Sequence, residues 1–352
     1  MQVKDKMKQC TLSIIVPVYN ATNMLRDCLD ALVRQDLSQY EVICINDGST
    51  EKQTYDILAE YEKKYAEIVK VYHIENGGVY KARKYGVSMA SGTYIGFCDC
   101  DDKVETNMYQ SMVTELETSG ADLVICGYHR VDYDTKKVFA TEMLGWSSFS
   151  INATTIGKLA IINTALWNKV YKKELFDNMM EFSQAPRIGE DMLLLLSIYP
   201  KIKKIAFVDA PLYNYYVRKG SSMNTVTIQE CNKTVQAFEK TVSKMFEKEE
   251  PEEWRALVDL MAFIHLGISL PVTVSGNKTV CKEVMHLTRK VLCEKYRTWK
   301  NSDFLTWKYI IRTDKKLAKV KIMQLVYKSH LFDCFLKVYR WMQVALKKDI
   351  KW

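Results

Sequence analysis

The first 130 residues alternate between short apolar runs and stretches with helical periodicity. Five apolar runs read as strands, at residues 12–18, 41–45, 69–74, 94–98 and 123–126. Between them lie four segments whose apolar residues recur every three or four positions, which predicts helices at 21–34, 55–65, 79–89 and 105–119. Strands that alternate with helices are joined by right-handed crossovers and pair into a largely parallel sheet. We therefore expect an α/β fold with a Rossmann-like, mostly parallel sheet flanked by helices.

Polar and turn-forming residues follow the first three predicted strands. Tyr19-Asn20 follows the first, Asn46-Asp47-Gly48-Ser49 the second and Asn76-Gly77-Gly78 the third. Asn-Gly and Asp-Gly pairs also form ordinary turns, which explains part of this pattern. Ligands of parallel sheets bind beyond the carboxyl ends of the strands. The pattern therefore predicts a ligand site at this edge of the sheet.

Three carboxylates follow the fourth predicted strand within four residues, in Asp99-Cys100-Asp101-Asp102. A buried strand that ends in clustered acids is costly unless a positive group lies beside them. A divalent cation with hard oxygen ligands meets this requirement, and a diphosphate is the usual partner of such a cation. The cluster therefore suggests an enzyme that acts on a nucleotide diphosphate. The structural alternative for Asp102 is an N-cap of the helix that follows.

The bulk composition indicates a globular intracellular protein. The chain has 352 residues, of which 48% are hydrophobic and 26% charged, enough for one large or two moderate domains. Its 10 cysteines form no CxxC pair, which fits a reducing cytosol. Residues 1–9 are polar and charged, so we expect no signal peptide, and no run of 18 apolar residues predicts a spanning helix.

Positive charge is concentrated near the C-terminus. Residues 281–352 carry 18 Lys and Arg against 6 Asp and Glu, although the whole chain has a net charge of only +8. After Thr225 the pattern is mostly helical, and the segment 315–351 mixes basic, aliphatic and aromatic residues. Such helices suit an anionic membrane surface. The alternative is a helical subdomain that packs on the catalytic core. No recognition motif accompanies the charge, so nucleic acid is not an expected partner.

Six motifs in a fixed order identify a family. In chain order they are Ile14-Ile15-Val16-Pro17-Val18-Tyr19-Asn20, Asn46-Asp47-Gly48-Ser49, Asn76-Gly77-Gly78 with Ala82-Arg83, Asp99-Cys100-Asp101-Asp102, Trp167-Asn168-Lys169-Val170-Tyr171 and Gly189-Glu190-Asp191. With these motifs the chain resembles the family 2 glycosyltransferases, which have the GT-A fold. The resemblance covers roughly residues 10–222. We expect a catalytic domain at 10–222 and a helical, basic region at 223–352.

The resemblance implies an inverting transfer of a sugar from a nucleotide diphosphate, usually UDP, with Mn²⁺ or Mg²⁺ as cofactor. Asp101 should bind the metal, with Asp99 near the metal and the ribose. Asp191 matches the family's general base, and Glu190 and Trp167 should lie on the acceptor side. The residues that should contact the nucleotide are Pro17, Val18, Tyr19, Asn20, Asp47, Asn76, Arg83, Asp99 and Arg218.

Several of these positions have a structural alternative. Arg83 could form a surface salt bridge, Trp167 could pack in the core, and Glu190-Asp191 could simply complement a helix dipole. Two positions depart from the family pattern: Cys100 stands where many members have Ser, and Lys84 stands where many have Asn. The second departure affects the expected nucleotide contacts next to Arg83.

The function expected from the sequence is a metal-dependent, inverting glycosyltransferase. It would move a sugar from a UDP-sugar to a glycan acceptor, including a lipid-linked one, in surface polysaccharide synthesis. Its expected location is cytoplasmic, at the inner face of the membrane. One alternative is a non-catalytic, sugar-nucleotide-binding scaffold, against which the intact Asp99, Asp101 and Asp191 argue. Another is a sugar nucleotidyltransferase, but its Gly-rich basic loop is replaced here by Tyr19-Asn20-Ala21-Thr22.

Overall fold

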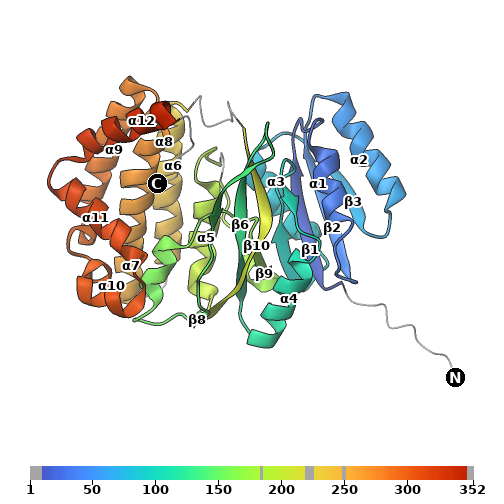
Figure 1. The fold of residues 1–352 in the computed structure, drawn as a ribbon, viewed down its shortest axis with the longest axis horizontal. Helices are drawn as coiled ribbons and strands as arrows, with labels where there is room; N and C mark the ends of the chain where they lie inside the picture. The colour runs from blue at the N-terminus through green and yellow to red at the C-terminus, as the bar shows by residue number, and fades with distance from the viewer. Residues whose placement is uncertain (1–9, 183–184, 219–225, 248–250, 347–352) are drawn as a thin grey trace. The chain divides into compact units, whose positions relative to one another are not determined.

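The computed structural model describes residues 10–182, 185–218, 226–247 and 251–346 (Figure 1). The chain forms two compact units. The first comprises residues 1–150 and 164–219, and the second comprises residues 151–163 and 220–352. Residues 151–163 thus belong with the second unit, although the sequence placed them in the catalytic domain. The boundary expected between 222 and 223 lies outside the described residues and stays a prediction.

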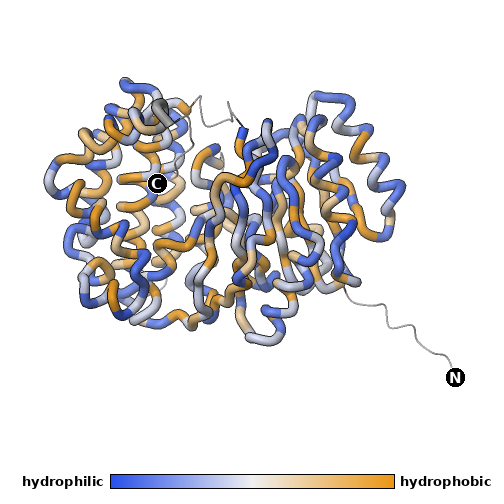
Figure 2. The backbone as a smooth tube through the Cα atoms, in the orientation of Figure 1, coloured by the Kyte–Doolittle hydropathy of each residue, from blue (hydrophilic) through white to orange (hydrophobic). Residues whose placement is uncertain are grey.

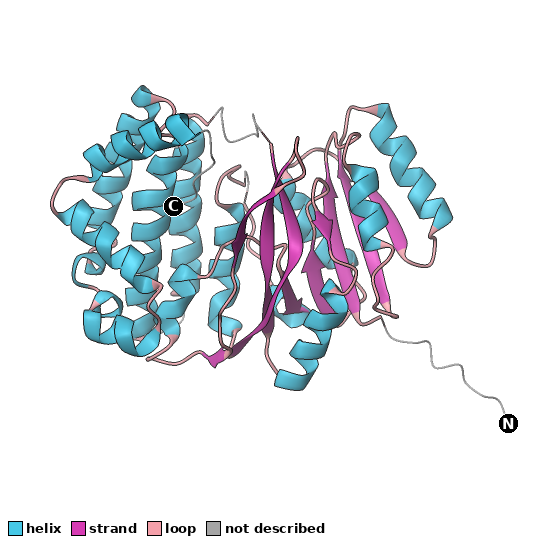
Figure 3. Ribbon diagram, in the orientation of Figure 1, coloured by secondary structure: helices cyan, strands magenta, loops and turns pink. Residues whose placement is uncertain are grey.

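A mixed sheet forms the centre of the first unit (Figure 3). Its strand order is β3-β2-β1-β4-β9-β6-β10-β5. Its parallel pairs are β1–β2, β2–β3, β1–β4 and β6–β10. β9 runs antiparallel between β4 and β6, and β5, β7 and β8 add antiparallel pairs. The strands are β1 (Leu12–Val18), β2 (Tyr40–Asp47), β3 (Val69–Ile74), β4 (Tyr94–Phe97), β5 (Lys103–Val104), β6 (Leu123–Asp132), β7 (Val138–Glu142), β8 (Phe149–Ser150), β9 (Lys169–Lys172) and β10 (Lys204–Val217).

Helices cover the sheet and bury its apolar strands. Every residue of β1 and β2 is buried, as expected for strands covered on both faces. α3 packs on β1 and β2 so closely that a Cβ at Gly86 would lie 2.4 Å from Ile15 Cγ2. The helices of this unit are α1 (Leu25–Leu32), α2 (Lys52–Lys64), α3 (Val79–Met89), α4 (Met108–Ser119), α5 (Glu190–Ile198), η2 (Lys173–Phe176) and η3 (Tyr199–Lys201).

The second unit is helical, which confirms the expected helical C-terminal region. Apolar and polar residues alternate along its helices (Figure 2). α6 begins with a reciprocal capping box between Thr227 and Glu230. Its elements are η1 (Ile156–Ile161), α6 (Ile228–Met245), α7 (Glu252–Ala262), η5 (Phe263–Ser269), α8 (Leu270–Thr273), α9 (Lys278–Glu294), η6 (Thr298–Asn301), η7 (Asp303–Leu305), α10 (Trp307–Thr313), α11 (Leu317–Lys328) and α12 (Phe332–Leu346).

One continuous helical stretch, Glu252–Thr273, has the length and apolar composition of a membrane-spanning helix. Its most apolar window has a mean hydropathy of 1.7, but 67% of that window is buried inside the protein. A core helix passes the same test of length and composition. The sequence had predicted no spanning helix, and the burial of this stretch fits a core helix of the second unit.

Candidate active site

A cavity of about 290 Å³ lies at the carboxyl ends of β1, β2 and β4. This is the edge at which the polar strand ends were expected to meet, because the strands run parallel. Ten predicted residues line the cavity: Pro17, Val18, Tyr19, Asn20, Asp47, Arg83, Asp99, Asp101, Glu190 and Arg218. Four lining residues were not predicted: Ala21, Met24, Val79 and Cys100. The other predicted residues, Asn76, Trp167 and Asp191, are not among those that line it.

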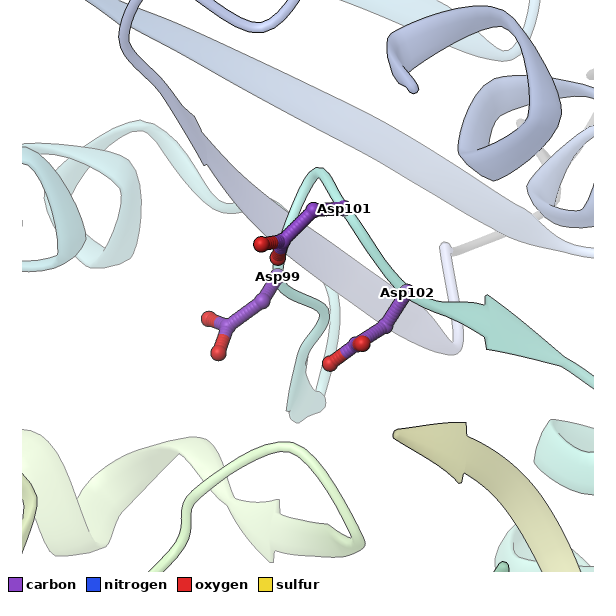
Figure 4. A group of neighbouring side chains, drawn as sticks. All are labelled: Asp99, Asp101 and Asp102. Atoms are coloured by element: carbon purple, nitrogen blue, oxygen red, sulfur yellow. The ribbon is translucent and has the colours of Figure 1, made fainter. Parts of the chain in front are cut away.

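The three clustered aspartates lie on the loop after β4 (Figure 4). One carboxylate oxygen from each of Asp99, Asp101 and Asp102 lies within 4.8 Å of the others. Asp102 is 1% exposed and fully engaged, because its oxygens accept hydrogen bonds from the Tyr213 hydroxyl and the Tyr216 amide, both at 2.8 Å. The N-cap alternative for Asp102 is wrong, since α4 begins only at Met108.

Asp99 and Asp101 are suited to hold a divalent cation. Both line the cavity, and carboxylate oxygens are the ligands that Mg²⁺ and Mn²⁺ prefer. Burial raises the pKa of Asp101, and the nearby charge of Asp99 raises it further. Negative charge is therefore crowded at this position, although Arg218 Nη2 lies 2.5 Å from Asp101 Oδ2 and offsets part of it. A bound cation would relieve the remaining repulsion.

Arg83 joins two acidic parts of the site. It lies on α3 and is 4% exposed. Its Nη2 donates to Asp99 Oδ1 at 2.9 Å, and its Nη1 donates to Asp191 Oδ1. The interpretation of Arg83 as a surface salt bridge is therefore wrong. Instead, a buried guanidinium fixes the carboxylate that follows β4 relative to the carboxylate at the start of α5.

Glu190 and Asp191 occupy the first turn of α5, which follows Gly189 in the left-handed conformation with φ +79°. The positive end of the helix dipole favours carboxylates at this position. Burial nevertheless raises the pKa of Glu190 to about 8, with a further contribution from the charge of Asp191. Burial also raises the pKa of Asp191, whereas Arg83 acts in the opposite direction. The two neighbours thus differ in their ion pairs. Asp191 pairs directly with Arg83, whereas no ion pair of Glu190 is found among the described residues.

Lys169 is a buried lysine near Asp191. The sequence analysis placed it in a family motif but gave it no role of its own. It lies on β9 with 0% exposure, and its Nζ donates to the Asn168 side-chain oxygen at 2.9 Å and to the Ala165 carbonyl. Burial lowers the pKa of Lys169 to about 7, while the charge of Asp191 raises it. The available signal was its place in the motif Trp167-Asn168-Lys169-Val170-Tyr171, between two apolar pairs of residues.

Hydrogen bonds between loops hold the other strand ends together. The two carboxylate oxygens of Asp47 accept from the Gly77 and Gly78 amides, each at 2.8 Å. Asn76 Nδ2 donates to the Asp47 carbonyl at 2.9 Å, which turns its side chain to the turn instead of the cavity. Asn20 Oδ1 accepts from the Thr50 amide at 2.8 Å. The nucleotide contacts of these three residues stay predictions. The structure shows that each of them bonds one loop to another at the carboxyl edge of the sheet.

Trp167 is 4% exposed and lies in a stack of aromatic rings. Its ring centroid is 4.2 Å from that of Tyr213 and 5.5 Å from that of Tyr215, with nearly parallel planes. This geometry favours the packing alternative over an acceptor platform. Tyr213 also bonds to Asp102, so the stack supports the loop that carries the acid cluster.

The fold is that of the GT-A glycosyltransferases. The crystal structure of S. aureus TarS 1–349 in complex with UDP-GlcNAc matches 97% of this chain and 93% of that chain, with a TM-score of 0.64 at 18% identity. The mannosyltransferase PcManGT from Pyrobaculum calidifontis, in complex with GDP-Man and Mn²⁺, matches 87% of this chain and 86% of that chain, with a TM-score of 0.52 at 16% identity.

Sequence comparison gives the family. The model of glycosyl transferase family 2 matches residues 13–183. The glycosyltransferase GlyG of Streptococcus pneumoniae is 30% identical over 247 residues, which span 66% of this chain and 79% of GlyG. The uncharacterized glycosyltransferase EpsJ of Bacillus subtilis is 33% identical over 210 residues, which span 58% of this chain and 60% of EpsJ. The chain therefore belongs to glycosyl transferase family 2, as the motifs indicated, although it matches little more than half of the length of EpsJ.

Proposed function

We propose that this glycosyltransferase moves a sugar from a UDP-sugar to a glycan acceptor with inversion at the anomeric carbon, in the presence of Mn²⁺ or Mg²⁺. The observation that carries the proposal is the bridge made by Arg83 between Asp99 and Asp191. Through this bridge a single guanidinium group contacts both Asp99, the candidate metal-side carboxylate, and Asp191, the candidate base. The UDP-GlcNAc complex of TarS supports a UDP-sugar donor, and the PcManGT complex supports Mn²⁺.

Asp99 and Asp101 would hold the cation, and the lining residues from Pro17 to Asn20 would face the nucleotide. When bound, the cation supplies charge compensation for the diphosphate that leaves. Arg218 lines the same cavity and adds a second positive group for the diphosphate. Its ion pair with Asp101 then exchanges for one with a phosphate, a contact in which Arg is especially effective.

Asp191 would accept the proton of the acceptor hydroxyl as that oxygen attacks the anomeric carbon. A positioned carboxylate typically accelerates such a step by about 10²- to 10⁴-fold. Arg83 orients this carboxylate and favours its ionised form. Attack from the face opposite the leaving diphosphate inverts the anomeric configuration. Glu190, with its pKa raised to about 8 by burial, would stay largely protonated at neutral pH and donate a hydrogen bond on the acceptor side.

The acceptor we propose is a glycan carried on a lipid, in surface polysaccharide synthesis at the cytosolic face of the membrane. Two relatives name a lipid acceptor, cholesterol galactosyltransferase of Borreliella burgdorferi and processive diacylglycerol beta-glycosyltransferase of Mycoplasma genitalium. A third, poly(ribitol-phosphate) beta-glucosyltransferase of Bacillus spizizenii, names a phosphate polymer. Their identities of 24–27% do not extend those substrates to this chain.

A membrane contact is part of the same proposal. The last three helices bury one apolar face, which includes Leu317, Val320 and Phe332. They also leave large apolar side chains at least 49% exposed, on the same helices as many lysines: Trp307, Ile311, Ile322, Leu325, Val338 and Trp341. Exposed apolar residues beside lysines suit insertion into an anionic lipid surface.

Release of UDP from a panel of UDP-sugars tests the enzymatic proposal. We expect slow release with Mn²⁺ that increases when an extract containing lipid-linked glycans is added. Asp191→Asn should abolish the acceptor-dependent part and still bind UDP. A wild-type protein that binds a UDP-sugar but never releases UDP would instead support the sugar-nucleotide-binding scaffold.

A further inference from the structure

A cluster of cations and aromatic rings lies directly beside the cavity. Lys136 Nζ lies 4.1 Å from the ring centroid of Tyr133 and 5.0 Å from that of Tyr216. The guanidinium of Arg218 lies 5.7 Å from the same Tyr133 ring. We call Tyr133, Lys136, Tyr216 and Arg218 the Lys136 cluster. Arg218 also lines the cavity, so the cluster adjoins the candidate active site.

The backbone ties this cluster to the acid motif. Tyr133 donates its amide to the Val217 carbonyl at 3.0 Å, and Tyr216 donates its amide to Asp102 Oδ1 at 2.8 Å. Lys136 lies in the turn between β6 and β7 with φ +58°, a left-handed conformation that is unfavourable for a residue with a side chain. Its amide donates to the Asp132 carbonyl at 2.8 Å. The turn therefore holds Lys136 over the rings at a cost in backbone energy.

Lys136 has no ion-pair partner among the described residues. Its side chain is exposed, and within the part of the chain that the structure describes it contacts rings and no carboxylate. Asp132, at the end of β6, accepts at its Oδ1 from the amide and hydroxyl of Thr135, each at 2.8 Å. Lysine is an effective point charge for phosphate, and tyrosine adds a ring face and a hydroxyl. The cluster thus offers a ready site for an anion attached to a sugar or polyol.

We propose that Lys136, with the rings of Tyr133 and Tyr216, binds a phosphate group of the acceptor next to the attacked hydroxyl. This inference rests on the proposed function. Arg218 lines the cavity and Lys136 does not, so the donor diphosphate would contact Arg218. An anion on Lys136 would lie beside the cavity on the Arg218 side, which is where we place the acceptor. The substrate class is therefore a glycan or polyol phosphate.

The test uses the full chain with UDP and Mg²⁺ in excess, so that the donor cavity is occupied. Glycerol 3-phosphate is titrated in a calorimeter. Glycerol serves as the uncharged control, and glycerate serves as the control with a carboxylate in place of the phosphate. The variants are Lys136→Gln and the matched control Lys137→Gln, which removes the same charge from the next exposed residue. A separate titration with UDP alone tests the proposed donor site. Failure of the donor proposal can therefore be told from failure of the acceptor-phosphate proposal.

We expect saturable binding of glycerol 3-phosphate to the wild type and to Lys137→Gln, with about fivefold weaker binding to Lys136→Gln, the upper range for an exposed ion pair. Equal affinity for the two variants would overturn the proposal, as would the absence of saturable binding. Binding of glycerol 3-phosphate that appears only when UDP is left out would assign it to the donor diphosphate position and overturn the proposal. Equal binding of glycerate would rule out selectivity for phosphate.

Discussion

Arg83 on α3 donates a hydrogen bond to the carboxylate of Asp191 at the start of α5, and only 5% of its side chain is exposed. The same guanidinium reaches Asp99 at 2.9 Å. Breaking a buried ion pair leaves a charge without a partner, which is strongly destabilising locally. The arrangement couples the position of the candidate base to that of the carboxylate beside the candidate metal site.

Replacement of Arg83 tests this coupling. We expect Arg83→Gln to lower kcat for sugar transfer at least 100-fold, because Asp191 loses its orienting partner and Asp99 its counter-charge. Arg83→Lys should recover little, since one ammonium cannot replace a two-pronged guanidinium. The matched control is Arg26→Gln, which breaks an exposed pair with Glu60 and should leave kcat unchanged. A wild-type kcat in Arg83→Gln would contradict the role of the bridge.

Asp191→Asn keeps the shape of the side chain and removes its basicity. We expect kcat to fall by about 10²- to 10⁴-fold, the usual contribution of a general base. The affinity for UDP should change less than threefold, because Asp191 does not line the cavity. Steady-state kinetics and UDP titration measure the two quantities, with the exposed Asp56→Asn as control. A large loss of UDP affinity with unchanged kcat would assign Asp191 to donor binding.

The raised pKa of Glu190 predicts a stability that depends on pH. Burial raises this pKa from 4.5 to about 8, so between these pH values the folded chain holds a proton that the unfolded chain has lost. The free energy of unfolding therefore falls as pH rises through this window. Glu190→Gln removes the effect, so its Tm relative to wild type should increase by about 3 °C or more from pH 5 to pH 8. A constant difference, as expected for the exposed Glu67→Gln, would contradict the shift.

Point variants test the membrane contact without disturbing the helical core. Ile322 is 54% exposed and Leu325 49%, so serine at these positions should leave folding intact. We expect Ile322→Ser with Leu325→Ser to reduce flotation with vesicles of phosphatidylglycerol and phosphatidylcholine about tenfold, because two half-exposed apolar side chains would no longer insert into the lipid. Val138→Ser, at a position with 50% exposure in the first unit, is the control. Equal flotation of all three proteins would remove the membrane proposal.

Apart from the two-residue strand β5, the strands and helices before residue 120 could be predicted because their signals are local. The apolar runs at 12–18 and 69–74 and the helix at 79–89 match β1, β3 and α3 residue for residue. β9 was not foreseen as a strand, because its antiparallel position between β4 and β6 depends on pairing with distant segments. For the same reason the sequence could not show that residues 151–163 pack with the second unit.

The site was predictable in its location but not in its internal contacts. Parallel strands bring Asp47 and Asp99 to one edge, so their proximity followed from the fold class. The partners of Arg83 could not be inferred from the local pattern of α3, because Asp191 comes from a helix more than 100 residues later. Likewise, the burial of Asp102 beneath Tyr213 depends on the register of β10 against β5.

The central claim is that Asp99 and Asp101 hold a cation against the diphosphate of the donor. Calorimetric titration of UDP with and without Mn²⁺, on the wild type and on Asp101→Asn, tests it most directly. We predict that Mn²⁺ tightens UDP binding to the wild type at least tenfold, through its contact with both the carboxylates and the phosphates. Asp101→Asn should lose that dependence while it retains its Tm. The same affinity for UDP in both proteins, with no response to Mn²⁺, would contradict the claim.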